Sequence, residues 1–152
     1  MKKLAQFVLL VACMFLVAKS VLAVKSGGES LGGIKPNDSA NAVIKMYGNP
    51  ESKSKGEYRY PSKGLIFSLS DNRINSIKAF GASTAKTRAG IHIGSTRAQV
   101  KAAYPGIEDV YTEDPNRLSW EDCVSAVGSD ITFTFTADKV SEIFLFGRHC
   151  ND

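Results

Sequence analysis

The chain has 152 residues, of which 19 are basic, 15 are acidic and 43% are hydrophobic. That length allows one domain or two very small ones. The formal charge of +4 does not gather into the clustered basic face that nucleic-acid binding needs, because Lys53, Lys55, Arg59 and Lys63 form only a loose patch. We therefore expect no nucleic-acid partner.

The first 23 residues have the three-part layout of a secretory signal peptide. Two lysines precede an almost wholly apolar run at 4–18, and small residues end at Ala23. A stable membrane span needs about 20 apolar residues, and Lys19 ends this run too early. We expect cleavage after Ala23 and a periplasmic or secreted mature protein with a formal charge of +1.

Cys13 offers an alternative to cleavage after Ala23, because residues 10–13 resemble a lipidation box. Against it, residues 14–18 continue the apolar run, whereas a mature lipoprotein usually turns polar after its cysteine. Lipidation at Cys13 or an uncleaved signal would be the only route to the membrane. Either would suit an envelope structural or assembly protein.

Cleavage would leave Cys123 and Cys150, and such a pair is expected to form a disulfide in an oxidising compartment. On the chain-entropy model this bond stabilises the fold by roughly 3–4 kcal/mol. A zinc site needs four clustered ligands, and only His149 is close to either cysteine in sequence. We expect no metal site and no cofactor.

A pattern of residues occurs twice in the chain. Four residues have the same residue type 57 positions later: Gly33, Ile34, Val43 and Tyr47. Three more have the same residue type 66 positions later: Phe67, Ile77 and Phe80. The recurrence predicts repeat unit one at 31–81 and repeat unit two at 88–148, with about nine extra residues in the second. The glycine-rich residues 24–30 are expected to form a flexible lead-in.

Unit one is expected to begin with a helix, because apolar residues recur at helical spacing over 40–47. Asp38 or Ser39 can cap that helix. Strands are expected at 58–60, 65–70 and 74–80, with a turn at 71–72 before the last of them.

Unit two repeats this order. Its predicted elements are a helix capped by Ser95 or Thr96, strands at 118–127, 131–136 and 140–146, and a turn at 137–138. Thr96 and Gln99 have capping-box spacing. The predicted fold class is α+β: two tandem helix-plus-antiparallel-sheet repeats, with the helices on one face of the sheet and the other face open.

Residues 93–100, Ile-Gly-Ser-Thr-Arg-Ala-Gln-Val, resemble the opening helix of the beta-lactamase inhibitor protein fold. They are similar also to the small lipoprotein of the outer-membrane barrel-assembly machinery, where a Gly-Met-Thr-Arg-x-x-Val-type start leads into a helix and an antiparallel sheet. The resemblance covers most of 31–148 as a pattern and implies two tandem copies. Ser95 stands where the family often has Met, and unit one lacks the cysteines expected of an inhibitor repeat. We therefore transfer no enzyme-contacting residues.

Catalytic residues are not expected. The mature chain offers only His92 and His149 as bases, and no serine lies in a Gly-x-Ser-x-Gly elbow. The acidic stretch at 108–122, which includes Asp114, does not have the spacing of a calcium loop. It is either a solvated loop or an acidic finger for a basic cleft on a partner. A carboxylate pair there would serve a small hydrolase, the least favoured alternative.

The last predicted strand does not alternate cleanly, so at least one of Phe144 and Phe146 should face away from the helices. Tyr58, Tyr60 and Trp120 are expected near it as further aromatic anchors for a partner, with Asp114. The competing explanation is a small core under the 106–122 loop. The sequence thus favours an exported, non-catalytic protein-binding module, and one form of it is an inhibitor of an envelope or extracellular enzyme.

Overall fold

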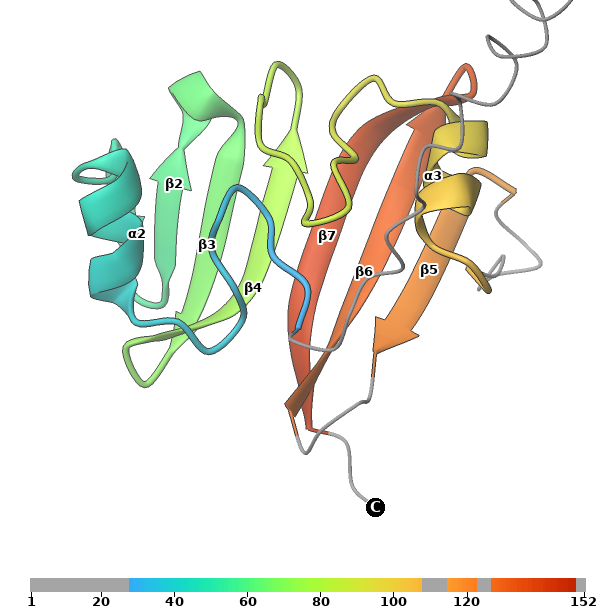
Figure 1. Ribbon diagram of the computed structural model, residues 1–152. Coiled ribbons are helices and arrows are strands. Elements are labelled where there is room, and N and C mark those ends of the chain that lie inside the picture. The colour runs from blue at the N-terminus through green and yellow to red at the C-terminus, as the bar shows by residue number, and fades with distance from the viewer. Residues whose placement is uncertain (1–27, 108–114, 123–126, 150–152) are drawn as a thin grey trace, which may run out of the picture.

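The computed structural model describes residues 28–107, 115–122 and 127–149 (Figure 1). The expected signal peptide at 1–23, with Cys13, lies outside these residues. So do Asp114 and the Cys123–Cys150 pair, and the expectations about all of them stay predictions. No helix among the described residues combines the length and apolarity needed to cross a membrane.

Seven strands, two α-helices and one 3-10 helix make up the described chain. In order they are α2 (Ala40–Tyr47), β1 (Ser52–Ser54), β2 (Glu57–Tyr60), η1 (Pro61–Lys63), β3 (Leu65–Ser70), β4 (Arg73–Phe80), α3 (Arg97–Ala103), β5 (Arg117–Asp122), β6 (Val127–Thr136) and β7 (Lys139–His149). The strands form a single antiparallel sheet in the order β1-β2-β3-β4-β7-β6-β5.

The prediction of two tandem helix-plus-sheet repeats is therefore wrong. Instead of two sheets the chain builds one, because β4 and β7 pair directly from Ser76↔Phe146 to Phe80↔Glu142. Two separate sheets would leave the backbone groups along these two strands without partners, and pairing satisfies them. Alternation along a sequence identifies strands but not their neighbours. The division at 31–81 and 88–148 itself stays a prediction.

The hairpins β3–β4 and β6–β7 share one register. Phe67 pairs with Ile77 and Phe133 pairs with Ile143, and each hairpin has a register shift just beyond those pairs. Both hairpins close through two residues with positive φ: 50° and 61° at Asp71 and Asn72, 49° and 61° at Ala137 and Asp138. Positive φ at both central positions is the backbone of a type I′ turn, whose twist matches that of the strands. The predicted turns are confirmed.

The main core fills one side of the sheet. Both helices, together with the chain at 28–39 and 81–96, lie on that side (Figure 1). Tyr47 of α2 packs against Phe67 with ring centroids 5.6 Å apart, and Tyr104 after α3 packs against Phe133 at 5.2 Å. The largest fully buried side chains are Tyr60, Tyr104, Phe67, Phe133, Leu31, Ile34, Leu65, Ile74, Ile77, Leu118, Ile131 and Ile143.

The two helices begin differently. Thr96 and Gln99 form the predicted capping box at α3, which is confirmed. Ser39 is the N-cap of α2 by position, but its side chain makes no capping bond. The start of α2 is held instead by the turn of the β3–β4 hairpin, since the Ala40 amide donates to the carbonyl oxygen of Asn72 at 3.0 Å.

Candidate functional site

Alternate residues of the central strands point away from the core and form what we call the bare face. It consists of Ile66 and Ser68 on β3, Ser76, Lys78 and Phe80 on β4, Glu142, Phe144 and Phe146 on β7, and Asp130, Thr132 and Thr134 on β6. Cross-strand pairing fixes their order. Ile66, Lys78, Phe144 and Thr132 make one continuous row across four strands. Pairs in such rows have Cβ atoms about 5 Å apart, which brings their side chains into contact.

An apolar strip runs over the centre of the bare face. It consists of Ile66, Phe80, Phe144 and Phe146, all half-buried, and none of them packs against the main core. The rings of Phe144 and Phe146 are 5.7 Å apart and tilted by 36°. The strip is therefore a second apolar cluster, on the side of the sheet that neither of the two described helices covers.

Short polar residues flank the two phenylalanines. Ser76 and Asp130, each 7% exposed, are the cross-strand neighbours of Phe146, and Thr132, 9% exposed, is a neighbour of Phe144. Thr132 Oγ1 also lies 2.7 Å from Ser119 Oγ. The two half-buried rings thus lie among smaller side chains that are themselves almost fully covered.

An ion pair crosses the centre of the bare face. Lys78 Nζ lies 2.7 Å from Glu142 Oε2, and the two side chains are 38% and 35% exposed. Lys78 lies beside Phe144 in the sheet and Glu142 lies beside Phe80. Aromatic residues are enriched at the centre of protein interfaces and charged residues are depleted there, so this ion pair is a feature that a partner has to match.

The residues expected from the sequence to bind a partner do not gather in one place. Phe144 lies on the bare face, as does Phe146. Tyr58 and Tyr60 are buried in the main core, 6% and 1% exposed, and the Tyr60 hydroxyl donates to the carbonyl oxygen of Gly48 at 2.8 Å. Their burial in the core keeps both rings from a partner on the surface. Trp120 lies in β5 opposite Ile131, and Asp114 lies outside the described residues.

Sequence reasoning missed Ile66, Phe80 and the Lys78–Glu142 pair. Ile66 could have been found, because the alternation over 65–70 already places it opposite to Phe67. Phe80 and the ion pair could not, since they come together only through the pairing of β4 with β7.

No group of three or more metal-ligating side chains occurs among the described residues. His92 lies in the turn before α3, where its Nδ1 is 2.7 Å from the carbonyl oxygen of Ile93. The His92 amide also donates to Ser95 Oγ at 3.1 Å. These contacts fix the turn that leads into the helix.

No family model, curated protein or solved structure matches this chain. The resemblance to beta-lactamase inhibitor proteins and to the outer-membrane assembly lipoprotein therefore stays a prediction.

Proposed function

We propose that this protein is a non-catalytic module that binds another protein through the bare face. The observation that carries the proposal is the apolar strip of Ile66, Phe80, Phe144 and Phe146, which is partly exposed although the main core does not use it. Exposed aromatic rings at the centre of a surface are favoured anchors in protein interfaces.

The shape of the strip favours a protein as the occupant. It spans β3, β4 and β7 at the middle of the sheet, so it extends over three neighbouring strands. A partner that fits it presents an apolar side chain to the two phenylalanine rings. The same partner presents polar or charged groups to the Lys78–Glu142 pair, which would otherwise lose water without compensation. For an exported chain this partner would belong to the envelope or the exterior, and an enzyme inhibited there is one form of it.

The alternative role, in envelope structure or assembly, requires lipid at Cys13 or an uncleaved signal. Mass spectrometry of the mature amino terminus separates the two. A chain that begins at Val24 excludes lipidation at Cys13, and a diacylated cysteine would favour the assembly role.

The proposal is tested by affinity capture from periplasmic and secreted fractions of the source cells. The wild-type chain, the double variant Phe144→Ala/Phe146→Ala and the control Met46→Ala serve as baits. Met46 is 52% exposed on α2, away from the bare face. We expect the double variant to bind its partner with an affinity at least about 30-fold lower than the wild type. That factor corresponds to the binding free energy of about 2 kcal/mol that one anchor residue contributes. Met46→Ala should capture as the wild type does.

Circular dichroism of all three baits shows whether they are folded. If the folded double variant captures the same proteins in the same amounts, the bare face is not the binding surface and the proposal is wrong.

A further inference from the structure

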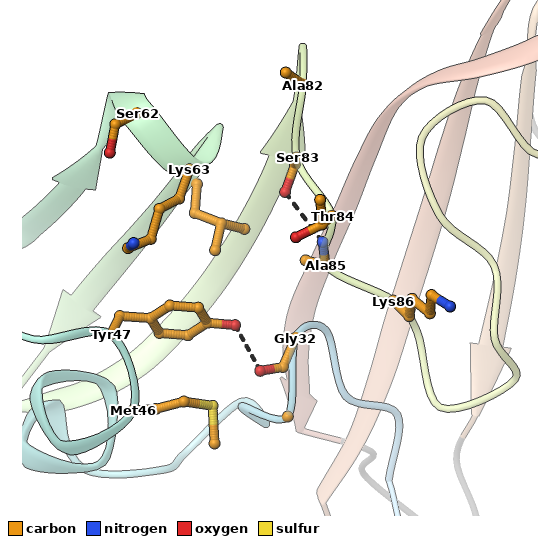
Figure 2. Close-up of a pocket in the computed structure, with 12 residues that line it drawn as sticks. Gly32, Met46, Tyr47, Ser62, Lys63, Ala82, Ser83, Thr84, Ala85 and Lys86 are labelled. Atoms are coloured by element: carbon orange, nitrogen blue, oxygen red, sulfur yellow. Dashed lines mark hydrogen bonds between the residues drawn. The ribbon is translucent and has the colours of Figure 1, made fainter.

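A cleft of about 550 Å³ lies on the helix side of the sheet, between α2, η1 and the chain at 82–86 (Figure 2). Sites for small molecules have volumes of about 300–1,000 Å³. The cleft is separated from the bare face by the sheet itself. It therefore offers the molecule a second surface that the proposed protein partner does not use.

Hydrogen bonds fix the walls of the cleft in advance. The Tyr47 hydroxyl donates to the carbonyl oxygen of Gly32 at 2.6 Å, and the Gly32 amide donates to that of Lys86 at 2.9 Å. On the other side the Phe80 amide donates to the carbonyl oxygen of Gly64 at 3.0 Å, and the Ser83 amide to that of Phe80 at 3.1 Å. A preformed site avoids the cost of ordering loops when a ligand arrives.

The surface of the cleft combines an apolar part with two hydroxyl groups. The ring of Tyr47 and the side chains of Leu65 and Ala85 form the apolar part. Burial raises the pKa of Tyr47, so its ring carries no charge at neutral pH. Ser83 Oγ accepts from the Ala85 amide at 3.4 Å and keeps its own proton to donate. Figure 2 shows the Ser83 and Thr84 hydroxyls directed toward the Tyr47 side of the cleft.

The charges around the cleft are positive. Lys63 and Lys86 line it from opposite sides, with both ammonium groups directed outward in Figure 2, and no carboxylate is among its lining residues. Within the described part of the chain, neither lysine forms a salt bridge. The Glu51 carboxylate accepts from both the amide and the hydroxyl of Ser62 and keeps its negative charge beside the cleft. Two cations against this one acid leave the surroundings of the cleft net positive, which attracts an anion.

We propose that this cleft binds a small organic anion, namely a carboxylate joined to a compact apolar or aromatic group. The apolar group lies against Tyr47 and Leu65. The carboxylate accepts hydrogen bonds from the Ser83 and Thr84 hydroxyls, and the exposed side chains of Lys63 and Lys86 turn toward it from opposite sides to supply the opposite charge. The proposal does not rest on the bare face, so either one can fail without the other.

The test uses 3-phenylpropionate as the probe and the neutral 3-phenylpropanamide as its matched control. Amide resonances of ¹⁵N-labelled protein are followed during titration. We expect shifts at Gly32, Ser83 and Thr84 that saturate with the carboxylate. We expect the neutral amide to bind at least about 5-fold more weakly, since it lacks the charge-assisted bonds.

Variants locate the binding site. Lys63→Met/Lys86→Met should weaken binding of the carboxylate by at least about 5-fold, and Thr84→Val by about 3-fold. All three side chains are exposed, so the variants should fold. Lys101→Met removes an exposed lysine of α3 and should leave binding unchanged. The proposal is overturned if the two probes bind equally, if no cleft resonance shifts, or if Lys101→Met weakens binding as much as the double variant does.

Discussion

Glu29 is a fully buried residue, 0% exposed. Its hydrogen bonds reach the neighbouring Ser30 and three residues that are far away in the sequence. Its Oε1 accepts from the amides of Ser30 at 2.8 Å and Arg88 at 2.7 Å, and its Oε2 accepts from the Tyr104 hydroxyl at 2.9 Å. The Glu29 amide donates to Ser129 Oγ at 3.0 Å. One side chain thus connects the start of the described chain to the loop before α3 and to the end of that helix.

We expect Glu29→Ala to lower the free energy of unfolding by about 3 kcal/mol, because it leaves buried donors without an acceptor. Urea denaturation followed by circular dichroism measures the loss. The control is Glu142→Ala, which removes a half-exposed ion pair with Lys78 and should cost less than about 1 kcal/mol. An equal fall in the free energy of unfolding of the two variants would show that the buried hydrogen bonds of Glu29 stabilise the fold no more than the half-exposed ion pair does.

Burial raises the pKa of Tyr47, Tyr60 and Tyr104 above the usual 10.0, and for Tyr104 the nearby Glu29 charge adds to the effect. The folded state therefore keeps protons that the unfolded chain releases above that pH. Below pH 10 these groups leave the stability unchanged, and above it the unfolded state is favoured, so the free energy of unfolding falls as the pH rises.

Urea titrations between about pH 8 and pH 11.5 test this expectation, with absorbance at 295 nm reporting ionised tyrosine. Tyr60 and Tyr104, which are fully buried, should ionise only as the chain unfolds. Tyr47→Phe should reduce the alkaline loss. A stability that stays constant up to pH 11.5 would contradict the burial of these hydroxyls.

Substituting alanine at Gly64 and at Gly81 distinguishes the cost of a positive φ from the cost of a steric clash. Both have positive φ, +59° and +60°. A Cβ at Gly64 would lie 2.2 Å from the carbonyl oxygen of Phe80, whereas at Gly81 it would meet nothing within 4 Å. Gly81→Ala should cost about 1 kcal/mol for its backbone angle alone. Gly64→Ala should cost at least about 3 kcal/mol, because the backbone must also move. Similar thermal midpoints for the two variants would show that the backbone around Gly64 moves away from the added Cβ at little cost.

At the scale of elements, the two helix starts make a matched pair. Thr96 Oγ1 accepts from the Gln99 amide at 3.2 Å, while the Ser39 side chain caps nothing. Thr96→Ala should destabilise the fold by about 1 kcal/mol and Ser39→Ala by less than about 0.3 kcal/mol. Thermal unfolding of both variants measures the difference. An equal effect would mean that α3, like α2, is held by its neighbouring hairpin rather than by its cap.

Local patterns predicted the elements well. The helix at 40–47, the capping box and both hairpin turns follow from spacing and turn chemistry, which act within a few residues. The bounds of the strand predicted at 118–127 were less accurate, since β5 ends at Asp122 and β6 begins at Val127. The short strand β1 and the turn η1 carry no alternating apolar pattern and were not predicted.

The candidate site was harder to predict than the elements. The broken alternation of the last strand predicted at least one of Phe144 and Phe146 on the uncovered side, and both lie there. Tyr58 and Tyr60 alternate in the same way, yet they point into the core, because a period of two does not say which side of the sheet is covered. That information lies in the contacts of α2 with β2 and β3, such as the 5.8 Å approach of Tyr47 to Tyr60.

At the scale of the whole molecule, the pairing of β4 with β7 makes one core from both ends of the chain. Ile77 and Leu145 are cross-strand neighbours at this join, and both are 0% exposed. Continuous packing across a sheet favours a single cooperative unfolding transition.

We expect Phe133→Ala, in β6, to lower the free energy of unfolding by about 4 kcal/mol, because it removes a fully buried ring. If unfolding is global, amide protection in β3 should fall by the same free energy, although β3 is three strands away. Hydrogen exchange measures both. Full protection of β3 in this variant would mean that the two ends of the sheet unfold separately.

The position of Glu29 on the helix side of the sheet determines how the protein should be immobilised for a binding measurement. Gly28 and Glu29 lie on the helix side, where the Arg88 guanidinium donates to the Gly28 carbonyl oxygen at 3.4 Å. A tether attached ahead of Gly28 therefore leaves the phenylalanine surface turned toward the solution over a sensor chip. Random coupling through amines would also modify Lys78 and mask that surface.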